Sequence, residues 1–510
     1  MDWREFRDLS AKKDECYYLI GLDMGDDSSG IAFYNAAEGQ PEVIDLSGGY
    51  GKPSIPTVMQ YISETKEWAF GEYAVLNRGM GTEITLSGLM QRLGKFDYID
   101  VNGESMGVAA ILALFIGEML GSVKNINPKA EIVGVVATVP AYFSEQAHEE
   151  FQEAFSIAGY GSQLIALVSD RECVLANHYR VPPTEQERLL LLDFGSRELR
   201  GGLYDVKPET DRILAASMSS VFDDEISTKK INDDVQVLFE SFVISQGVKQ
   251  KQLNEHISAF TYQHKDLLFQ KNITQKPIKL YFNFAYPPFQ HTVDNSRAKS
   301  LIKPYATRFN KFIKAVLEKS LYETPARPTD IDTVICVGGG FEMLWAKEAV
   351  CGLFSKKQVK FYRNSKMAAA EGAALIAAKA VGVIDQPQLV AEDKHQLTGD
   401  IGIAAEGVFL PLVERNSFWW QKHTPKLVLV NAEVDGGISF RLEERKEAST
   451  PRSLGEVALK GLTKRPKGTT RLEFAVSFTS NTELIVTVSD RGFGDLFPAV
   501  DYRMQIDFNL

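Results

Sequence analysis

The chain has 510 residues and a formal net charge of −11, with 56 lysines and arginines against 67 aspartates and glutamates. Proteins that bind nucleic acid neutralise its phosphates with clustered lysine and arginine, so this acidic balance argues against a nucleic-acid partner. The length predicts two to four domains, each with its own hydrophobic core.

The four cysteines lie in apolar stretches without the C-x-x-C spacing of a metal or redox site, which is typical of buried thiols in a reducing compartment. The first ten residues carry several charges, which argues against a signal peptide. The longest apolar run, residues 108–117, is about half of what a membrane-spanning helix needs, and it predicts a core helix. We therefore expect a cytoplasmic protein without a membrane partner.

The predicted elements begin with strands and then alternate with helices. Strand patterns lie at residues 19–24, 31–34, 43–46, 189–194, 202–206 and 213–219. Helix patterns lie at residues 108–123 and 145–158, and a turn is expected at Glu38-Gly39. Residues 224–330 are mostly helical and polar, with an apolar exception at 278–284. This alternation predicts an α/β region.

The character of the chain changes after Gly382. Residues 386–396 are polar and contain proline, which is typical of a linker. Beyond them, apolar and polar residues alternate with a period of two in four segments: residues 427–430, 438–442, 471–478 and 483–488. Strands of this length and spacing predict an antiparallel β-sandwich.

Three segments share one design, an apolar run that ends in a glycine turn: residues 19–25, 190–195 and 333–340. A buried strand that stops at glycine exposes backbone N–H groups that phosphate oxygens can approach closely. Asp23 and Asp193 precede the glycine in the first two segments, and no acid does so in the third. This pattern predicts two loops at a metal-bound phosphate and a third at the base or sugar of a nucleotide.

At these residues the chain resembles the actin-like ATPases and, within them, the DnaK-type heat-shock chaperones. Further segments match in family order at residues 53–58, 135–143, 155–159, 369–374 and 412–416, so that the resemblance covers about residues 17–490. It implies an α/β actin-like two-lobed nucleotide-binding domain followed by an all-β sandwich domain. The corresponding boundaries are 1–384 for the first domain, with lobe I at about 17–188 and lobe II at about 189–384, 385–397 for a linker, and 398–510 for the sandwich.

The resemblance implies a site for ATP or ADP with Mg²⁺. Asp23, Asp170 and Asp193 correspond to the catalytic carboxylates, and Asp23 and Asp193 also to the groups near the metal. The residues expected around the nucleotide come from all three loops: Gly25, Asp26, Asp27, Ser28, Gly195, Ser196, Gly338, Gly339, Gly340 and Glu342.

The first loop departs from the family pattern, because Asp26 and Asp27 replace two threonines. Two like charges about 4 Å apart repel by about 4 kcal/mol at an effective dielectric of 20, so these carboxylates oppose a triphosphate. Either a cation lies between them and the phosphates, or the loop does not hold phosphate in the usual way. The alternative is that both aspartates simply cap a turn.

Other positions depart from the pattern as well. The catalytic lysine falls at Met90, and a thioether cannot stabilise developing charge, although Arg92 or Lys95 substitutes for it if the register differs. Asp170 stands for a glutamate, and Glu342 for an arginine that stacks on adenine. In the second loop Arg197 and Arg200 either contact phosphate or are solvated surface residues, and the surface alternative is favoured.

In the sandwich, the resemblance implies a peptide site. Ala404, Ala405 and Glu406 correspond to a loop that arches over the bound peptide, and Ile438 and Phe440 lie near its pocket. The alternative is that Ile438, Phe440 and Leu442, which share one face of a strand, are ordinary core residues. The chain stops at Leu510, so we expect no helical lid, and the linker has only two large apolar residues, which predicts weak docking.

We therefore predict a divergent chaperone-like protein, weak or inactive as an ATPase, whose sandwich binds a polypeptide partner. One alternative is an active ATP-dependent chaperone that releases peptide from the sandwich. A second alternative is an actin-like assembly protein, against which the sandwich argues.

Overall fold

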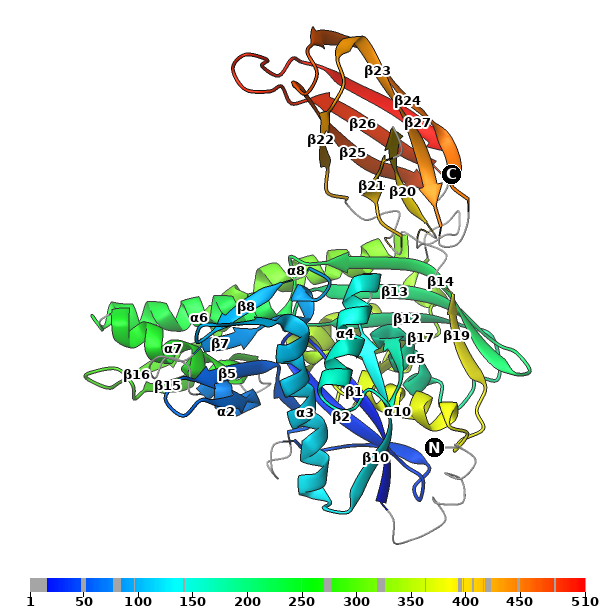
Figure 1. Cartoon of the computed structure of the whole chain (residues 1–510). Helices are drawn as coiled ribbons and strands as arrows, with labels where there is room; N and C mark the ends of the chain where they lie inside the picture. Colours follow the sequence, from blue (N-terminus) through cyan, green and yellow to red (C-terminus); the bar gives the residue numbers. More distant parts are fainter. Residues whose placement is uncertain are drawn as a thin grey trace. The chain divides into compact units, whose positions relative to one another are not determined.

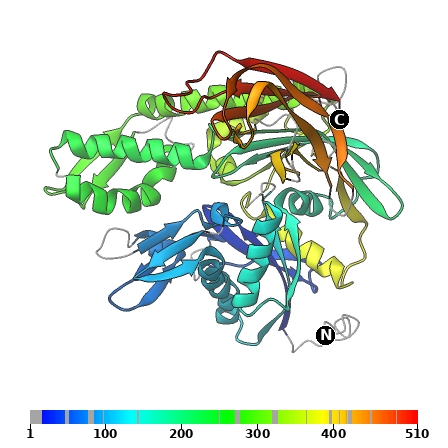
Figure 2. The same cartoon turned by 45° about the horizontal axis from the view of Figure 1, so that its top comes forward.

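The structure is a computed structural model that describes residues 16–46, 52–76, 84–95, 97–140, 143–248, 250–269, 277–318, 326–362, 364–392, 397, 399–405, 408–415, 417, 423–446, 450–480 and 483–509. It divides into two compact units, Met1–Glu392 and Asp393–Leu510. Unit 1 contains two lobes (Figures 1 and 2), and the two units are described one after the other.

Lobe I is built on a sheet with the order β11-β10-β1-β2-β3. Its strands are β1 (Cys16–Met24), β2 (Ser28–Asn35), β3 (Gln40–Val43), β10 (Ala130–Val139) and β11 (Leu164–Ser169). β10 is parallel to β1 and β11 to β10, whereas β2 and β3 are antiparallel neighbours. The apolar runs of β1 and β10 are buried, because both faces of the sheet are covered.

Helices α3 (Val108–Ile126) and α4 (Glu145–Ile157) pack together in lobe I. The stretch Val108–Asn125 is long and apolar enough to cross a membrane, but Ile111, Leu112, Phe115 and Ile116 are completely buried in the core of lobe I. The apolar run therefore forms the core helix that the sequence predicted.

Lobe II repeats the sheet order of lobe I. Its strands are β12 (Glu187–Phe194), β13 (Leu199–Pro208), β14 (Arg212–Asp223), β17 (Thr333–Val337) and β18 (Val359–Phe361), in the order β18-β17-β12-β13-β14. β17 is parallel to β12, and β13 and β14 are antiparallel, so each strand has a counterpart in lobe I. The two similar halves and the α/β actin-like two-lobed fold predicted from the sequence are confirmed.

Smaller elements complete the two lobes. Lobe I adds β4 (Ser54–Pro56), β5 (Val58–Ile62), β6 (Glu67–Phe70), α2 (Gly71–Leu76), β7 (Ile84–Ser87), η1 (Leu89–Arg92), β8 (Tyr98–Val101) and β9 (Glu104–Gly107). Lobe II adds α6 (Thr228–Ser245), α7 (Gln250–His264), η2 (Lys265–Phe269), β15 (Ile278–Phe282), β16 (Phe289–Val293), α8 (Asn295–Glu318), η4 (Pro328–Asp330), η5 (Gly339–Glu342) and α9 (Leu344–Leu353).

Two helices join the lobes. α5 (Asp170–His178) follows the sheet of lobe I, and α10 (Ala368–Ala380) follows β18 of lobe II but contacts β1, β2, β3 and β10. In Figure 2, α10 (yellow) lies beside the blue strands of lobe I. The two helices touch backbone to backbone, since a Cβ on Gly372 would lie 1.7 Å from the carbonyl oxygen of Cys173. Only glycine allows this approach.

The segment predicted as a linker contains a strand of unit 1, β19 (Gln388–Glu392). It pairs in parallel with the outer edge of β14, from Gln388 opposite Arg212 to Glu392 opposite Ala216. Leu389 packs against the buried cluster between the lobes. This segment therefore docks although it has few apolar side chains, because backbone pairing with a sheet edge needs few of them; the strength of the docking stays a prediction.

Unit 2 is a sandwich of two four-stranded antiparallel sheets, in the orders β21-β20-β23-β24 and β22-β25-β26-β27. The strands are β20 (Asp400–Ala405), β21 (Val408–Val413), β22 (Lys426–Val430), β23 (Val434–Arg445), β24 (Arg452–Arg465), β25 (Thr470–Ser480), β26 (Glu483–Asp490) and β27 (Arg503–Asn509). Their inward side chains form one hydrophobic cluster. The all-β sandwich predicted from the period-two alternation is confirmed.

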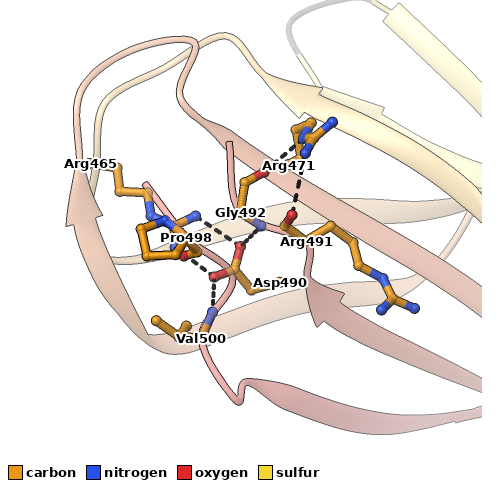
Figure 3. A network of polar contacts seen from close by, with 7 residues as sticks. All are labelled: Arg465, Arg471, Asp490, Arg491, Gly492, Pro498 and Val500. Carbon is orange, nitrogen blue, oxygen red and sulfur yellow. Dashed lines mark hydrogen bonds and ion pairs between the residues drawn. The ribbon is translucent and has the colours of Figure 1, made fainter. Parts of the chain in front are cut away.

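A buried ion pair fixes one end of the sandwich (Figure 3). Arg465 donates from both terminal nitrogens to the Asp490 carboxylate, at 2.8 and 2.7 Å. The backbone N–H groups of Gly492 and Val500 donate to the same carboxylate. Burial raises the pKa of Asp490, but the hydrogen bonds from Arg465 and the backbone outweigh it and hold the pKa below its ordinary value. The carboxylate thus organises the connection between β26 and β27.

We expect Gly372→Ala to destabilise unit 1, because the added methyl group meets the Cys173 carbonyl and forces α5 and α10 apart. The expected loss is about 1–3 kcal/mol, measured by urea unfolding. Gly352→Ala in α9 is the matched control, since a Cβ there meets no atom within 4 Å. If both variants unfold at the same urea concentration, the close helix contact does not limit stability.

Candidate nucleotide site

The first two glycine loops have the same geometry. Asp23 lies at the end of β1 and Asp193 at the end of β12, and each strand turns back into an antiparallel partner. The N–H of Gly25 donates to the carbonyl oxygen of Ser28 at 3.1 Å, and that of Gly195 to the carbonyl oxygen of Glu198 at 3.1 Å. The structure thus places both predicted aspartates at equivalent positions of the two lobes.

The structure brings Asp23, Asp193 and Asp170 within electrostatic range of one another. Burial raises the pKa of Asp23 to about 7; the hydrogen bond from Thr138, at 2.5 Å, opposes this shift, and the charges of Asp170 and Asp193 add to it. Burial likewise raises the pKa of Asp193 to about 6, against the charge of Arg200. Two partly buried carboxylates whose pKa values are raised toward neutrality are a favourable place for a cation.

Arg200 is a buried member of this cluster. Its residue is 9% exposed, and it donates to Asp170 at 2.8 Å and to Glu198. Burial lowers the pKa of Arg200, but the charges of Asp170, Glu198 and Asp193 raise it above its ordinary value. The surface alternative favoured for Arg200 is therefore wrong, because partners distant in sequence compensate its charge. Arg197 is exposed, in agreement with the alternative that it is a surface residue.

The third loop packs against the second. A Cβ on Gly338 would lie 2.6 Å from Asp193 Oδ1 and from the carbonyl oxygen of Phe194, and one on Gly340 would lie 2.1 Å from the Phe194 ring. Gly339 lies beside Lys366, which pairs with Glu342 at 3.7 Å. Glu342, which by the resemblance replaces the adenine-stacking arginine, is thus a carboxylate already opposed by a lysine.

The first loop is held from lobe I. Asp26 accepts a hydrogen bond from the Gln91 side chain at 3.0 Å, and the carbonyl oxygen of Asp27 accepts one from the Thr57 N–H at 2.9 Å. The Asp27 side chain is exposed. Burial raises the pKa of Asp233 in α6, and the charge of Asp27 adds to this shift. No pattern in the sequence indicated Gln91, which directly follows Met90. Its side-chain amide contacts the first glycine loop through Asp26.

Met90 is 1% exposed and belongs to the hydrophobic core of lobe I. Arg92, a candidate to replace the lysine, donates instead to Asp97 at 2.6 Å. Lys95 lies in the turn that follows η1, and among the described residues it makes no ion pair. The η1 segment therefore supports lobe I by packing and does not present a cation in place of the lysine.

Asp23 and Asp193 fit Mg²⁺ by the chemistry of their oxygens, since Mg²⁺ is usually held by one or two carboxylates together with water and phosphate. Over the described residues, no group of three or more histidine, cysteine, aspartate or glutamate side chains is placed to hold a metal ion by itself. Gly195 and Ser196 lie in the turn beside Asp193, and Ser28 closes the turn beside Asp23. A cation there needs a phosphate or water to complete its shell.

In the sandwich, Ala404 is buried and Ala405 exposed at the end of β20, and Glu406 lies outside the described residues. Ile438 is partly buried on β23, and Phe440 is 7% exposed with its ring edge-on to Phe474 at 5.4 Å. Phe440 is therefore a core residue of the sandwich. Its contact with a peptide stays a prediction.

A two-lobed sheet pair with duplicated aspartate-glycine hairpins defines an actin-like ATPase fold. The family model of the Hsp70 protein matches residues 89–495. Chaperone proteins DnaK are similar: those of Thermosipho melanesiensis and Thermosipho africanus are each 23% identical, covering 95% and 94% of this chain and 79% and 78% of their own length. That of Prochlorococcus marinus is 22% identical over 93% of this chain and 76% of its own. The chain belongs to the Hsp70 family.

We expect Asp23→Asn to stabilise the chain at high pH. In the folded chain the Asp23 carboxyl has a pKa of about 7 against 3.8 ordinarily. Its contribution to the free energy of unfolding is therefore fully present below pH 3.8 and is lost as the pH rises through 7. Asparagine can still accept from Thr138 and removes this loss, by about 1–4 kcal/mol at pH 8.

Urea unfolding of both proteins at pH 5 and pH 8 measures this difference, with Asp224→Asn as the exposed control. Mg²⁺ should stabilise the parent at pH 8 more than Asp23→Asn. If Asp23→Asn is less stable than the parent at pH 8, the pKa of Asp23 is not raised in the folded chain.

Proposed function

We propose that this Hsp70-family protein is a divergent chaperone-like protein whose nucleotide use is weak or lost and whose sandwich binds an extended polypeptide. The observation that carries the first part is the burial of Met90 in the core of lobe I, since by the resemblance this residue stands in place of the family's catalytic lysine. A lysine at that position could stabilise charge on the transferred phosphoryl group, whereas a buried thioether cannot.

The charges around the three loops support the same proposal. Arg200, the buried cation of the cluster, is bound by Asp170 and Glu198, so its charge is compensated within the protein. Asp26 and Asp27 add negative charge to the first loop. A triphosphate bound at this cluster would lie beside carboxylates of its own sign of charge. Mg²⁺ held by these carboxylates would then be the main group that neutralises the charge of the phosphates.

An active ATP-dependent chaperone remains the second candidate, and β19 favours it. In DnaK-type chaperones, as the resemblance implies, a docked linker couples nucleotide to peptide release, and here the corresponding segment pairs with β14. Docking of β19 on β14 requires no ATP hydrolysis. The active chaperone and the weak or inactive one therefore differ in their rate of ATP turnover.

The sandwich part of the proposal rests on β20 and β23. They are antiparallel neighbours, with Ala404 opposite Arg441 and Ile403 opposite Leu442. Ile438 is partly buried on the same face of β23 as the core residues Phe440 and Leu442. Both strands already pair on each side within the sheet β21-β20-β23-β24, so a peptide bound here would be held mainly by one or two apolar pockets.

We expect Mg-ATP hydrolysis by the purified chain to be indistinguishable from its Asp193→Asn variant, because the parent already lacks the charge-stabilising lysine. Steady-state phosphate release measures this, and calorimetry with Mg-ATP measures binding separately. Turnover in the parent that Asp193→Asn abolishes would establish the active chaperone instead.

The binding measurement has its own discriminating variant. Changing Asp26 and Asp27 together to threonine removes two negative charges and adds hydroxyl donors, so nucleotide affinity should rise by roughly tenfold. The single variants show which carboxylate matters, since Asp26 is held by Gln91 whereas Asp27 is exposed. Unchanged or reduced affinity would mean that the carboxylates hold a cation or face away from the nucleotide.

We expect Ile438→Ala to weaken capture of an extended apolar peptide by about 1 kcal/mol while the sandwich stays folded. Val428→Ala on β22, also partly buried, is the matched control and should leave capture unchanged. Phe440→Ala should instead destabilise the sandwich by about 3–5 kcal/mol. Fluorescence anisotropy and thermal unfolding separate these effects, and equal capture by Ile438→Ala and the parent would remove Ile438 from the site.

A further inference from the structure

A cavity of about 860 Å³ lies between the lobes, away from the three glycine loops. Its walls are β3 of lobe I, β18 of lobe II, the end of α5 and the first turns of α10. This volume is near the upper end of the range of ligand pockets, roughly 300–1,000 Å³. None of the residues assigned to the nucleotide lines it.

The repeated sheet order gives this cavity a counterpart. β3 corresponds to β14, and α10, which follows β18, corresponds to α5, which follows β11. β14 carries β19 on its outer edge, and β19 also contacts α5. The cavity, bordered by β3 and α10, is therefore the counterpart in lobe I of the groove that β19 fills in lobe II.

The outer edge of β3 is suited to a short strand. The N–H of Ile44 donates to Ile31 in β2, so the groups of Val43 and Pro41 point away from β2. Pro41 has no N–H, which leaves its carbonyl oxygen and the N–H and carbonyl oxygen of Val43 for an added strand. Among the described residues, no strand pairs with this edge.

The charges of the cavity indicate what it binds. Its acids are held by amides: Glu42 accepts from Asn35 at 2.7 Å, and Glu371 from Asn177 at 2.7 Å. Its cations, Arg180 and Lys360, are exposed, and neither forms an ion pair with another residue that the structure describes. The exposed charges at the rim are thus positive, whereas the two carboxylates are partly buried.

We propose that this cavity binds a short extended peptide that pairs in parallel with β3, as β19 pairs with β14. An aliphatic side chain of the peptide packs against Val43 and Val359, and an acidic side chain lies between Arg180 and Lys360. The ligand class is an acidic-aliphatic peptide segment, similar in composition to the chain's own residues 388–393.

The test uses the full chain and the labelled peptide acetyl-Gln-Leu-Val-Ala-Glu-Asp-amide, which has the sequence of residues 388–393. Saturable binding by fluorescence anisotropy is expected, and it should weaken roughly threefold to tenfold when Arg180→Glu and Lys360→Glu are combined. The matched control combines Lys356→Glu and Lys357→Glu, two exposed residues that precede β18 and do not line the cavity. It should leave binding unchanged.

Backbone pairing is tested in the peptide. Methylation of the amides that face β3 should weaken binding roughly fivefold or more, and methylation of the alternate amides should not. Ile438→Ala should have no effect, which separates this site from the sandwich. The proposal is overturned by absence of binding, by binding that survives the double charge reversal, by equal effects of both methylation patterns, or by glutarate competing as well as the peptide.

Discussion

The contact between α5 and α10 is the constraint on which unit 1 depends. The two helices meet where Gly372 lies against the Cys173 carbonyl, and α10 also meets β1, where a Cβ on Gly21 would lie 2.0 Å from the carbonyl oxygen of Ala370. The buried cluster around them contains residues from the sheets of both lobes. Because α10 belongs in sequence to lobe II and packs on lobe I, it brings β1 and β12 together. The approach of Asp23 to Asp193 follows from that packing.

The sequence predicts those parts of the structure that local patterns determine. The strands before Asp23 and Asp193, the core helix at Val108 and the period-two strands of the sandwich each bury a regular face, which leaves a pattern in the sequence. The position of Arg200 leaves no such pattern, because its partner Asp170 is 30 residues away and joins it only in the fold. The hydrogen bond from Gln91 to Asp26 spans 65 residues and is invisible for the same reason. The sequence around Arg200 is therefore typical of a surface residue, although tertiary pairing buries its side chain.

Strand β19 shows a different limit of sequence patterns. Its segment contains proline nearby and only two large apolar residues, which is typical of a linker. It forms a strand because β14 offers an unfilled edge, and the energy comes from main-chain hydrogen bonds that any residue except proline can make. The composition of a segment indicates how much apolar surface it can bury. Whether the segment pairs as a strand depends on a free sheet edge elsewhere in the chain.

The glycines of the third loop have a structural role that does not depend on a nucleotide. The sequence suggested that they leave room for phosphate, but a Cβ at Gly338 would strike Asp193 and Phe194, and one at Gly340 would strike the Phe194 ring. These positions require glycine for packing between β17 and β12, whether or not a nucleotide binds. Met90 and Glu342 meet different demands, since the Met90 thioether fills part of the lobe I core and the Glu342 carboxylate lies beside Lys366. Gly338 and Gly340 are therefore required by packing alone, and their presence does not measure activity.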